Sequence, residues 1–508
     1  MNSESKSIVI IGGGLGGLFT GAILAKEGQR VTVLEKNATI GGGLQSFRRF
    51  GETFDTGMHI IGGMQPGGNI RRICEYLGIM DKVQIMDVDD QCTDALYFAE
   101  DRQTYRIAKG RKGYIDSLAQ FFPEERANIE AYVDAIFRIV KEVPLFNLES
   151  SGLGIPVHSE EFTMSADAFI AKYVQNPKLR SVMAYMNPLY GGRGNQTPAY
   201  VQAIINVLYI SGASRFVGGS SRFAQLLADV ITNYGGTVLT GERVEWIEVA
   251  DRSVLYLRTK SGRQFSADYY ISAIHPCTLF TLMPPKALPK AYRDRLNSLP
   301  NAYSAFSLYI KLRPGSFPYI NHSEFYMTKY ADIWSFGDNQ MPWPLGFLFM
   351  TAPDDNQGPF ATHALVTAPM LFEATSRWQD TTVGHRGSDY EEWKKQQTER
   401  LLGMIGEIHP GFADCVEQVN AASPLTIRDF YGVKDGTICG FSKDYANLTL
   451  SQVPVVTKVR NLLLTGQNVN LHGFCGVPLT AIQTSEVILG QNKVLDSISE
   501  VTPHDEHS

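Results

Sequence analysis

The segment 7–35 constrains the fold of this chain more than any other. Four expected elements follow one another in it, namely a strand, a glycine-rich turn, a helix and a second strand, at 8–11, 12–17, 18–26 and 30–34. The turn carries Gly12, Gly14 and Gly17 in the spacing Gly-x-Gly-x-x-Gly, and Glu35 follows the second strand. Such a turn brings backbone amides and the positive end of a helix to a pyrophosphate, while the acid accepts a ribose hydroxyl. The pattern therefore predicts a Rossmann-like site for an adenine dinucleotide.

The glycines of this turn have separate physical tasks. Gly12 permits the tight bend, and Gly14 lets the backbone approach the pyrophosphate. Gly17 lets the helix pack close to the sheet. Gly16 lies in the same turn, and we expect it to contact the cofactor as well.

The residues after Glu35 indicate which dinucleotide the site takes. Lys36 follows at once, and a glycine cluster at 41–43 precedes Leu44. Nicotinamide domains usually continue into another helix and strand, whereas a glycine cluster lets the backbone wrap over the longer FAD. No second unit of the same type occurs later in the sequence, so separate FAD and NAD domains are not expected. We therefore expect FAD, contacted here by Lys36, Gly42, Gly43 and Leu44.

Composition bounds the class of protein. A length of 508 residues favours two domains, and 44% hydrophobic with 19% charged residues is typical of a globular protein with a large interior. The net charge of −6 and the absence of Lys/Arg blocks argue against nucleic-acid binding. The six cysteines are scattered without a Cys-x-x-Cys pair, which argues against a redox dithiol or a zinc site and favours the cytoplasm.

The sequence offers little for a membrane. No apolar run is long enough to span one, and the first residues lack the positive charge of a signal peptide. Peripheral membrane contact stays open, with the segments 143–157 and 200–213 as its candidates. A buried helix or a lid over a pocket explains both segments as well.

Parts of the nucleotide-binding domain are expected far downstream. A helix, a strand and an antiparallel meander are expected between 218 and 273, and a buried strand near 461–465 precedes a glycine loop and a helix at 479–489. The sequence thus predicts an α/β fold in which a Rossmann-like domain is discontinuous, at 1–75, 215–300 and 425–495. A second, α+β domain takes 76–214 and 301–424, and 496–508 forms a polar tail.

Two motifs carry a resemblance to a known family. The run from Phe54 to His59 is similar to the Phe-Asp-Thr-Gly-x-His of the retinol saturase branch of the carotenoid and retinoid oxidoreductases. The run from Thr465 to Val469 resembles the Thr-Gly-Gln-Asp-Val of the same branch, with Asn468 replacing the acid. With the nucleotide motif, these segments make the chain resemble that family, which lies in the superfamily of amine oxidases and phytoene desaturases.

The resemblance implies FAD-dependent chemistry on a carbon–carbon double bond of an apolar polyene, by hydride transfer through flavin N5. The electron donor is left open, with NAD(P)H as one option. The aromatic-rich second domain further leads us to expect a long apolar channel to the flavin. The remaining expected cofactor contacts are Val244 at the adenine, and Gly466, Gln467, Gly476 and Val477 toward the flavin.

His59 is the candidate for a catalytic acid, because the loop 55–59 should lie beside the isoalloxazine. A histidine in this place more often serves only to hydrogen-bond the flavin or the backbone. His472, beside the C-terminal glycine loop, is a second candidate. The loop at 473–478 should precede a helix whose positive end faces the pyrimidine ring.

Two other functions remain open at this point. The first is a flavin amine oxidase, in which Lys311 would be the lysine that such enzymes often present near N5, although a strand-end lysine is usually only solvated. The second is a non-catalytic, flavin-binding assembly factor. Amine turnover with peroxide release would select the first, and a bound flavin that nothing reduces would select the second.

Overall fold

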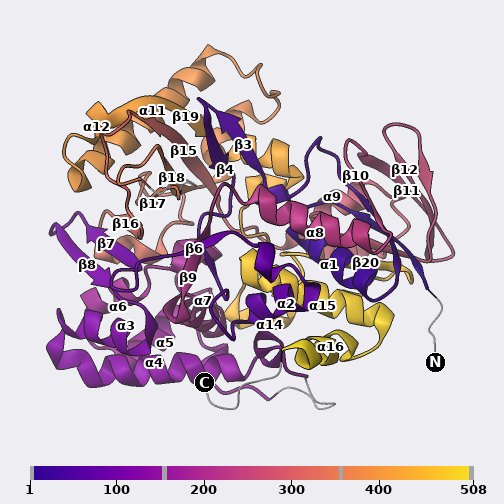
Figure 1. The fold of residues 1–508 in the computed structure, drawn as a ribbon, viewed down its shortest axis with the longest axis horizontal. Coiled ribbons are helices and arrows are strands. Elements are labelled where there is room, and N and C mark those ends of the chain that lie inside the picture. The colour runs from indigo at the N-terminus through magenta and orange to yellow at the C-terminus, as the bar shows by residue number, and fades with distance from the viewer. Residues whose placement is uncertain (1–4, 151–156, 354–357, 503–508) are drawn as a thin grey trace.

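The computed structural model describes residues 5–150, 157–353 and 358–502. A parallel five-stranded sheet forms one half, in the order β10-β2-β1-β14-β20. Figure 1 labels its two edge strands, β10 and β20. Its strands are β1 (Ser7–Ile11), β2 (Arg30–Leu34), β10 (Thr237–Leu239), β14 (Tyr269–Ser272) and β20 (Leu462–Leu464). The expected α/β fold is confirmed.

Alternate residues of β1 pack on opposite faces of this sheet. Ile8 and Ile10 lie in the core with α1 (Leu15–Lys26), which packs between α8 (Ser221–Asn233) and α15 (Gly473–Leu489). Val9 and Ile11 lie in a second core on the other face. That face is covered by β11 (Val244–Ala250), β12 (Ser253–Thr259), β13 (Gln264–Phe265) and α9 (Pro276–Thr281).

A mixed seven-stranded sheet forms the other half, in the order β19-β15-β18-β17-β16-β7-β8. Its strands are β7 (Asp94–Phe98), β8 (Gln103–Ile107), β15 (Ser304–Leu312), β16 (Ser323–Met327), β17 (Gly346–Thr351), β18 (His363–Met370) and β19 (Val416–Ala422). Phe306 and Leu308 of β15 pack in a core with α11 (Ser388–Ile408). Ala305 and Ser307 therefore face the opposite side of the strand, where the candidate site lies.

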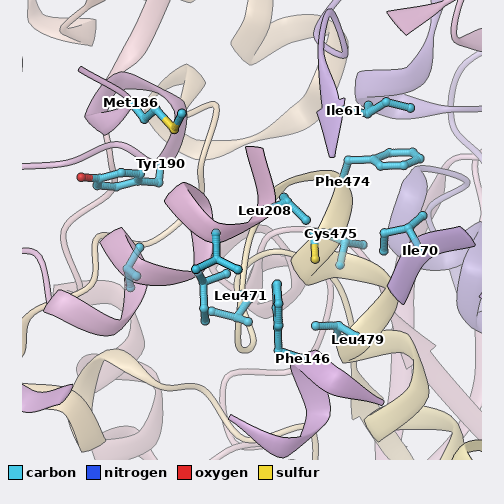
Figure 2. Packing of buried hydrophobic residues seen from close by; sticks show 14 of the residues in the cluster. Ile61, Ile70, Phe146, Met186, Tyr190, Leu208, Leu471, Phe474, Cys475 and Leu479 are labelled. Atoms are coloured by element: carbon cyan, nitrogen blue, oxygen red, sulfur yellow. The ribbon is translucent and has the colours of Figure 1, made fainter. Parts of the chain in front are cut away.

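The other elements connect and cover these sheets. The other helices are α2 (Asn69–Leu77), α3 (Gly110–Ala119), α4 (Arg126–Lys141), α5 (Ala166–Tyr173), α6 (Pro177–Met183), α7 (Ala199–Ser211), α10 (Lys290–Ser298), α12 (Phe412–Cys415), α13 (Pro424–Ile427), α14 (Leu448–Ser451) and α16 (Lys493–Val501). The short strands are β3 (Ser46–Arg49), β4 (Glu52–Asp55), β5 (Ile61–Gly62), β6 (Ile85–Asp87) and β9 (Ala213–Phe216). Figure 2 shows the apolar side chains around the start of α15, among them Leu471, Phe474 and Cys475.

The C-terminal helices differ from expectation. Helix α15 begins at Gly473, so the loop expected up to 478 is helical. The glycine at 476 serves close packing there, since a Cβ on Gly476 would lie 2.4 Å from the Cβ of Leu471. The polar tail expected from 496 also begins later, because Ile498 of α16 is fully buried. Residues 503–508 lie outside the described part.

One candidate membrane segment is interior. Helix α7 is largely buried, and it includes the fully buried polar residues Gln202 and Asn206. In the other candidate, 151–156 lie outside the described residues, while Val157 is 91% exposed. None of the helices in the described ranges combines the length and the apolar character that crossing a membrane requires. The boundaries of the two domains stay a prediction.

Candidate functional site

A cavity of about 550 Å³ lies between the two sheets, and residues from both line it. Thirteen of the expected cofactor residues are among its lining: Gly12, Gly14, Gly16, Glu35, Lys36, Gly42, Gly43, Leu44, His59, Val244, Gly466, Gln467 and Val477. Gly17 and Gly476 are not among the lining residues. Both serve packing, since a Cβ on Gly17 would lie 1.9 Å from the carbonyl oxygen of Gly12.

Two glycine segments form the floor of the cavity. The amide of Gly41 donates to the carbonyl of Gly13 at 2.7 Å, which brings the cluster at 41–43 against the first turn. A Cβ on Gly14 would meet only the Cα of Gly42, at 3.8 Å. The absence of side chains therefore leaves both backbones open to a bound group. Such a floor suits a pyrophosphate, which needs close backbone approach.

Glu35 holds the first turn in place. Its carboxylate is almost fully buried and accepts the amide of Gly13 at 2.8 Å through one oxygen and the amide of Asn37 at 2.8 Å through the other. An ionised carboxylate makes strong hydrogen bonds to backbone amides. Glu35 thus fixes the loop and still lines the cavity, where it can accept a ribose hydroxyl.

Lys36 connects this end of the cavity to a distant segment. Its Nζ donates to the carbonyl of Asp429 at 3.1 Å. Burial, with the nearby Arg243, lowers the pKa of Lys36 below its ordinary value. Asp429 belongs to a π-helical turn, η9 (Arg428–Gly432), and Arg386 binds its carboxylate at 2.5 Å.

This π-helical turn forms a wall of the cavity that the sequence did not predict. Phe430, Tyr431 and Gly432 line the cavity, and the hydroxyl of Tyr431 lies 3.1 Å from that of Thr56. A Cβ on Gly57 would come within 2.6 Å of the Tyr431 hydroxyl. Burial raises the pKa of Tyr431 to about 12. A π-helix has no sequence signature, although such turns are frequent at functional sites.

Asp55 positions the loop that carries His59. One of its oxygens accepts the hydroxyl of Ser46 at 2.7 Å and both the amide and the hydroxyl of Ser220, at 2.8 and 2.9 Å. Ser220 precedes α8, so this carboxylate joins the loop 55–59 to the start of that helix. The glycine pair at 218–219 makes the turn that brings Ser220 there, with positive φ at both residues.

His59 lines the cavity, and its Nδ1 is buried without a hydrogen-bond partner among the described residues. Burial lowers the pKa of His59, and Arg215 lowers it further, while the Asp55 carboxylate opposes both. The imidazole is therefore neutral at pH 7. The unpartnered nitrogen is free to bond a ligand in the cavity.

The second sheet contributes small, uncharged side chains to the cavity. They are Ala305, Ser307 and Thr367. The acidic and basic lining residues lie at the end of β2 and the start of β11, namely Glu35, Lys36, Glu242, Arg243 and Glu245. The long apolar channel was expected to be walled by aromatic residues of the second domain, but none of them is in this lining, and Phe306 and its neighbours on β15 pack into the core on the far side. Phe430 and Tyr431 are the aromatic residues other than histidine that line this cavity.

Two residues singled out from the sequence lie elsewhere. Lys311 pairs with Glu417 at 3.3 Å and does not line the cavity, so it is not placed as the amine oxidase lysine would be. His472 immediately precedes α15 and is buried outside the cavity lining. Neither position could have been read from the sequence, because each depends on which way a strand or helix end faces.

The residues present fit an FAD. The glycine floor is open to a pyrophosphate, Glu35 can accept a ribose hydroxyl, and Nδ1 of His59 needs a partner. Gly473 and Val477, in the first turns of α15, also line the cavity, and Val477 lies beside Gly16 of the first turn. The positive end of a helix there favours negative charge.

Comparison with known proteins also supports a flavin as the cofactor. The family described as flavin containing amine oxidoreductase matches residues 15–341. The all-trans-retinol 13,14-reductase of Rattus norvegicus is 28% identical over 535 residues, covering 97% of this chain and 87% of that protein. The chloroplastic prolycopene isomerase 2 of an Oncidium hybrid cultivar is 23% identical, covering 86% of this chain and 75% of that protein.

Solved structures share the fold. An oxidoreductase from Methanosarcina mazei superposes with a TM-score of 0.64 at 17% identity, covering 94% of this chain and all of that one. The likeness in fold extends over both sheets, since nearly the whole chain is covered. The resemblance to the retinoid and carotenoid oxidoreductases is confirmed by the relatives named above.

Proposed function

This chain belongs to the flavin containing amine oxidoreductase family and is an FAD-dependent oxidoreductase, and from that premise we propose that it acts on a carbon–carbon double bond of an apolar polyene. The proposal rests on the uneven distribution of charged side chains around the cavity. Its charged lining residues gather near the end of β2, whereas the second sheet contributes only Ala305, Ser307 and Thr367. A wall without charge suits a neutral, apolar substrate.

The flavin supplies hydride chemistry at N5 when bound. The glycine floor and Glu35 hold the dinucleotide end, and His59 offers a neutral imidazole to whatever fills the cavity. The Asp55 contacts orient the loop of His59. The assignment of individual residues to the cofactor is part of this proposal.

The relatives support a polyene rather than an amine. The relatives named above are a retinol reductase and a carotenoid isomerase, and Lys311 is paired with Glu417 outside the cavity lining. A reductive reaction needs an electron donor, and we propose NAD(P)H. No second dinucleotide unit occurs in the sequence, so the nicotinamide would have to approach the flavin through the cavity itself.

The proposed location in the cell follows from the solubility of the substrate. A polyene is poorly soluble in water, so we propose that the protein collects it by peripheral contact with a membrane from the cytoplasm. The scattered, unpaired cysteines support a reducing compartment.

An anaerobic spectroscopic experiment tests the function. The purified protein is reduced with dithionite or NAD(P)H, mixed with a retinoid or carotenoid, and followed by its flavin absorbance. Reoxidation of the flavin with loss of polyene absorbance supports the proposal. Reduction of the oxidised flavin by an amine, with peroxide release in air, would contradict the proposal and indicate an amine oxidase.

A further inference from the structure

Lys443 is a buried lysine without an acidic partner. Its side chain is 6% exposed, and its Nζ donates to the carbonyl of Ser451 at 3.1 Å. No carboxylate within the described residues forms an ion pair with it. The adjacent Asp444 turns away, because its carboxylate accepts the amide of Ala446 at 2.9 Å.

The surroundings of Lys443 add further unpaired polar groups. Both ring nitrogens of His472 and the hydroxyl of Ser442 are buried without a partner in the described part of the chain. Burial, together with the charge of Lys443, lowers the pKa of His472 to about 4, so this imidazole is neutral. Burial lowers the pKa of Lys443 to about 8, so the lysine is mostly charged at pH 7. The cluster therefore holds one buried positive charge.

This cluster adjoins residues that line the cavity. His472 is the residue before α15, and Gly473, the first residue of that helix, lines the cavity. Asn468 also lines it, and its side-chain oxygen accepts the amide of Phe441 at 3.2 Å, two residues before Lys443. The charge of Lys443 reaches His472, and His472 adjoins the start of α15, whose first residue lines the cavity.

A buried, unpaired cation is costly to keep. A single carbonyl contact does not offset its desolvation, so a negative charge developing nearby would be stabilised by Lys443. At low effective dielectric, a charge acts over several ångströms without direct contact.

We propose that Lys443, together with the N-terminus of α15, stabilises the negative charge that the pyrimidine end of the flavin gains on reduction. Lys443 is then a positioning residue that sets the reduction potential. This inference rests on the proposed function, since it needs a flavin in the cavity.

The test compares reduction potentials of the FAD-loaded protein. Lys443→Met removes the charge at similar side-chain length, and we expect at least a tenfold loss in the two-electron reduction equilibrium, equivalent to a potential about 30 mV more negative. Lys458→Met is the matched control, because Lys458 is exposed and solvent screens its charge. The control should keep the potential of the unmodified protein.

Thermal unfolding separates this role from a structural one. Removing an unpaired buried charge should leave the melting temperature unchanged or raise it. Should Lys443→Met melt earlier or lose its flavin, Lys443→Gln gives the same comparison, because its amide can still donate to the Ser451 carbonyl. An unchanged potential in whichever of the two variants retains FAD would overturn the inference. A parent protein that binds no FAD would instead contradict the proposed function.

Discussion

The hydroxyl of Tyr431 lies 3.1 Å from the hydroxyl of Thr56, and this contact joins the π-helical wall to the loop that carries His59. The two residues are 375 positions apart in the chain. Both line the cavity, so the contact closes one of its sides.

Removing this contact should loosen the cofactor. Tyr431→Phe loses one hydrogen bond, worth about 1 kcal/mol, which corresponds to roughly a fivefold weaker FAD affinity. Flavin fluorescence on release measures it. Tyr445→Phe is the control, because the hydroxyl of Tyr445 bonds the exposed Asn195 outside the cavity. Equal FAD affinity in both variants would show that the wall does not retain the cofactor.

Two glycines of the first turn should respond differently to substitution. Gly14→Val fills the open floor, so we expect a folded protein without flavin. Gly17→Ala places a Cβ 1.9 Å from the Gly12 carbonyl oxygen, and overpacking of this kind costs about 1–3 kcal/mol or more of folding free energy. Flavin content and thermal unfolding, measured on both variants, separate the two effects. If Gly14→Val also failed to fold, the two glycines would not have separate roles in cofactor binding and in packing.

Glu35→Gln should weaken FAD binding without unfolding the protein. The amides of Gly13 and Asn37 donate to different oxygens of Glu35, so the single carbonyl oxygen of glutamine keeps one of these bonds while its NH2 group faces the other donor. We expect about a tenfold rise in the FAD dissociation constant, near 1.4 kcal/mol. Calorimetric titration of the flavin-free protein measures it. A change below twofold would mean that Glu35 has no role at the ribose.

His59→Ala should slow turnover far more than it weakens FAD binding. The Nδ1 of His59 has no protein partner among the described residues, so little folding energy depends on it. A tenfold fall in the rate of flavin oxidation by substrate corresponds to about 1.4 kcal/mol of barrier. Because the pKa of His59 is lowered, its neutral form should persist and turnover should stay level above pH 7. Equal losses in rate and affinity would make His59 a structural residue.

His472 should make the protein less stable in acid. Its pKa is about 4 in the folded state and about 6.5 when exposed, so the unfolded chain binds more protons as the pH falls below 6.5. Stability is then lost on acidification, by about 2 kcal/mol between pH 7 and pH 5 from this group. Urea unfolding of His472→Gln should show a smaller loss over that range. His385→Gln, at an exposed site, should behave as the parent protein.

The sequence predicted those parts of the site that are formed by contiguous residues. The turn at 12–17 and Glu35 could be placed because strand, glycine spacing, helix and acid are contiguous. Ser307 and Thr367 could not, since their position depends on pairing between distant strands that the sequence leaves unspecified. The start of α15 was missed because Gly473 and Gly476 are typical of loops, whereas the packing of Leu471 requires Gly476 in a helix.

Polar contacts explain why α7 is interior. Of the two interpretations left open for its apolar run, the buried helix is the one that the structure shows, and the amide of Gln202 donates to the hydroxyl of Tyr132 and to the carbonyl of Met183, both at 3.2 Å. Those partners come from α4 and α6, and no local pattern indicates them.

The order in which the chain leaves the ribosome matters for the first sheet. Its central strand β1 (Ser7–Ile11) is synthesised long before its edge strand β20 (Leu462–Leu464) and the helix α15 (Gly473–Leu489) that packs on α1. Until then, the apolar side of α1 lacks one of its two neighbours, and the cavity lacks Gly466 and Val477. Contacts of such long range form late in folding. A complete flavin site therefore requires that the chain as far as Val477 has been synthesised and folded, and a flavin that binds only the folded state adds stability once these residues are in place.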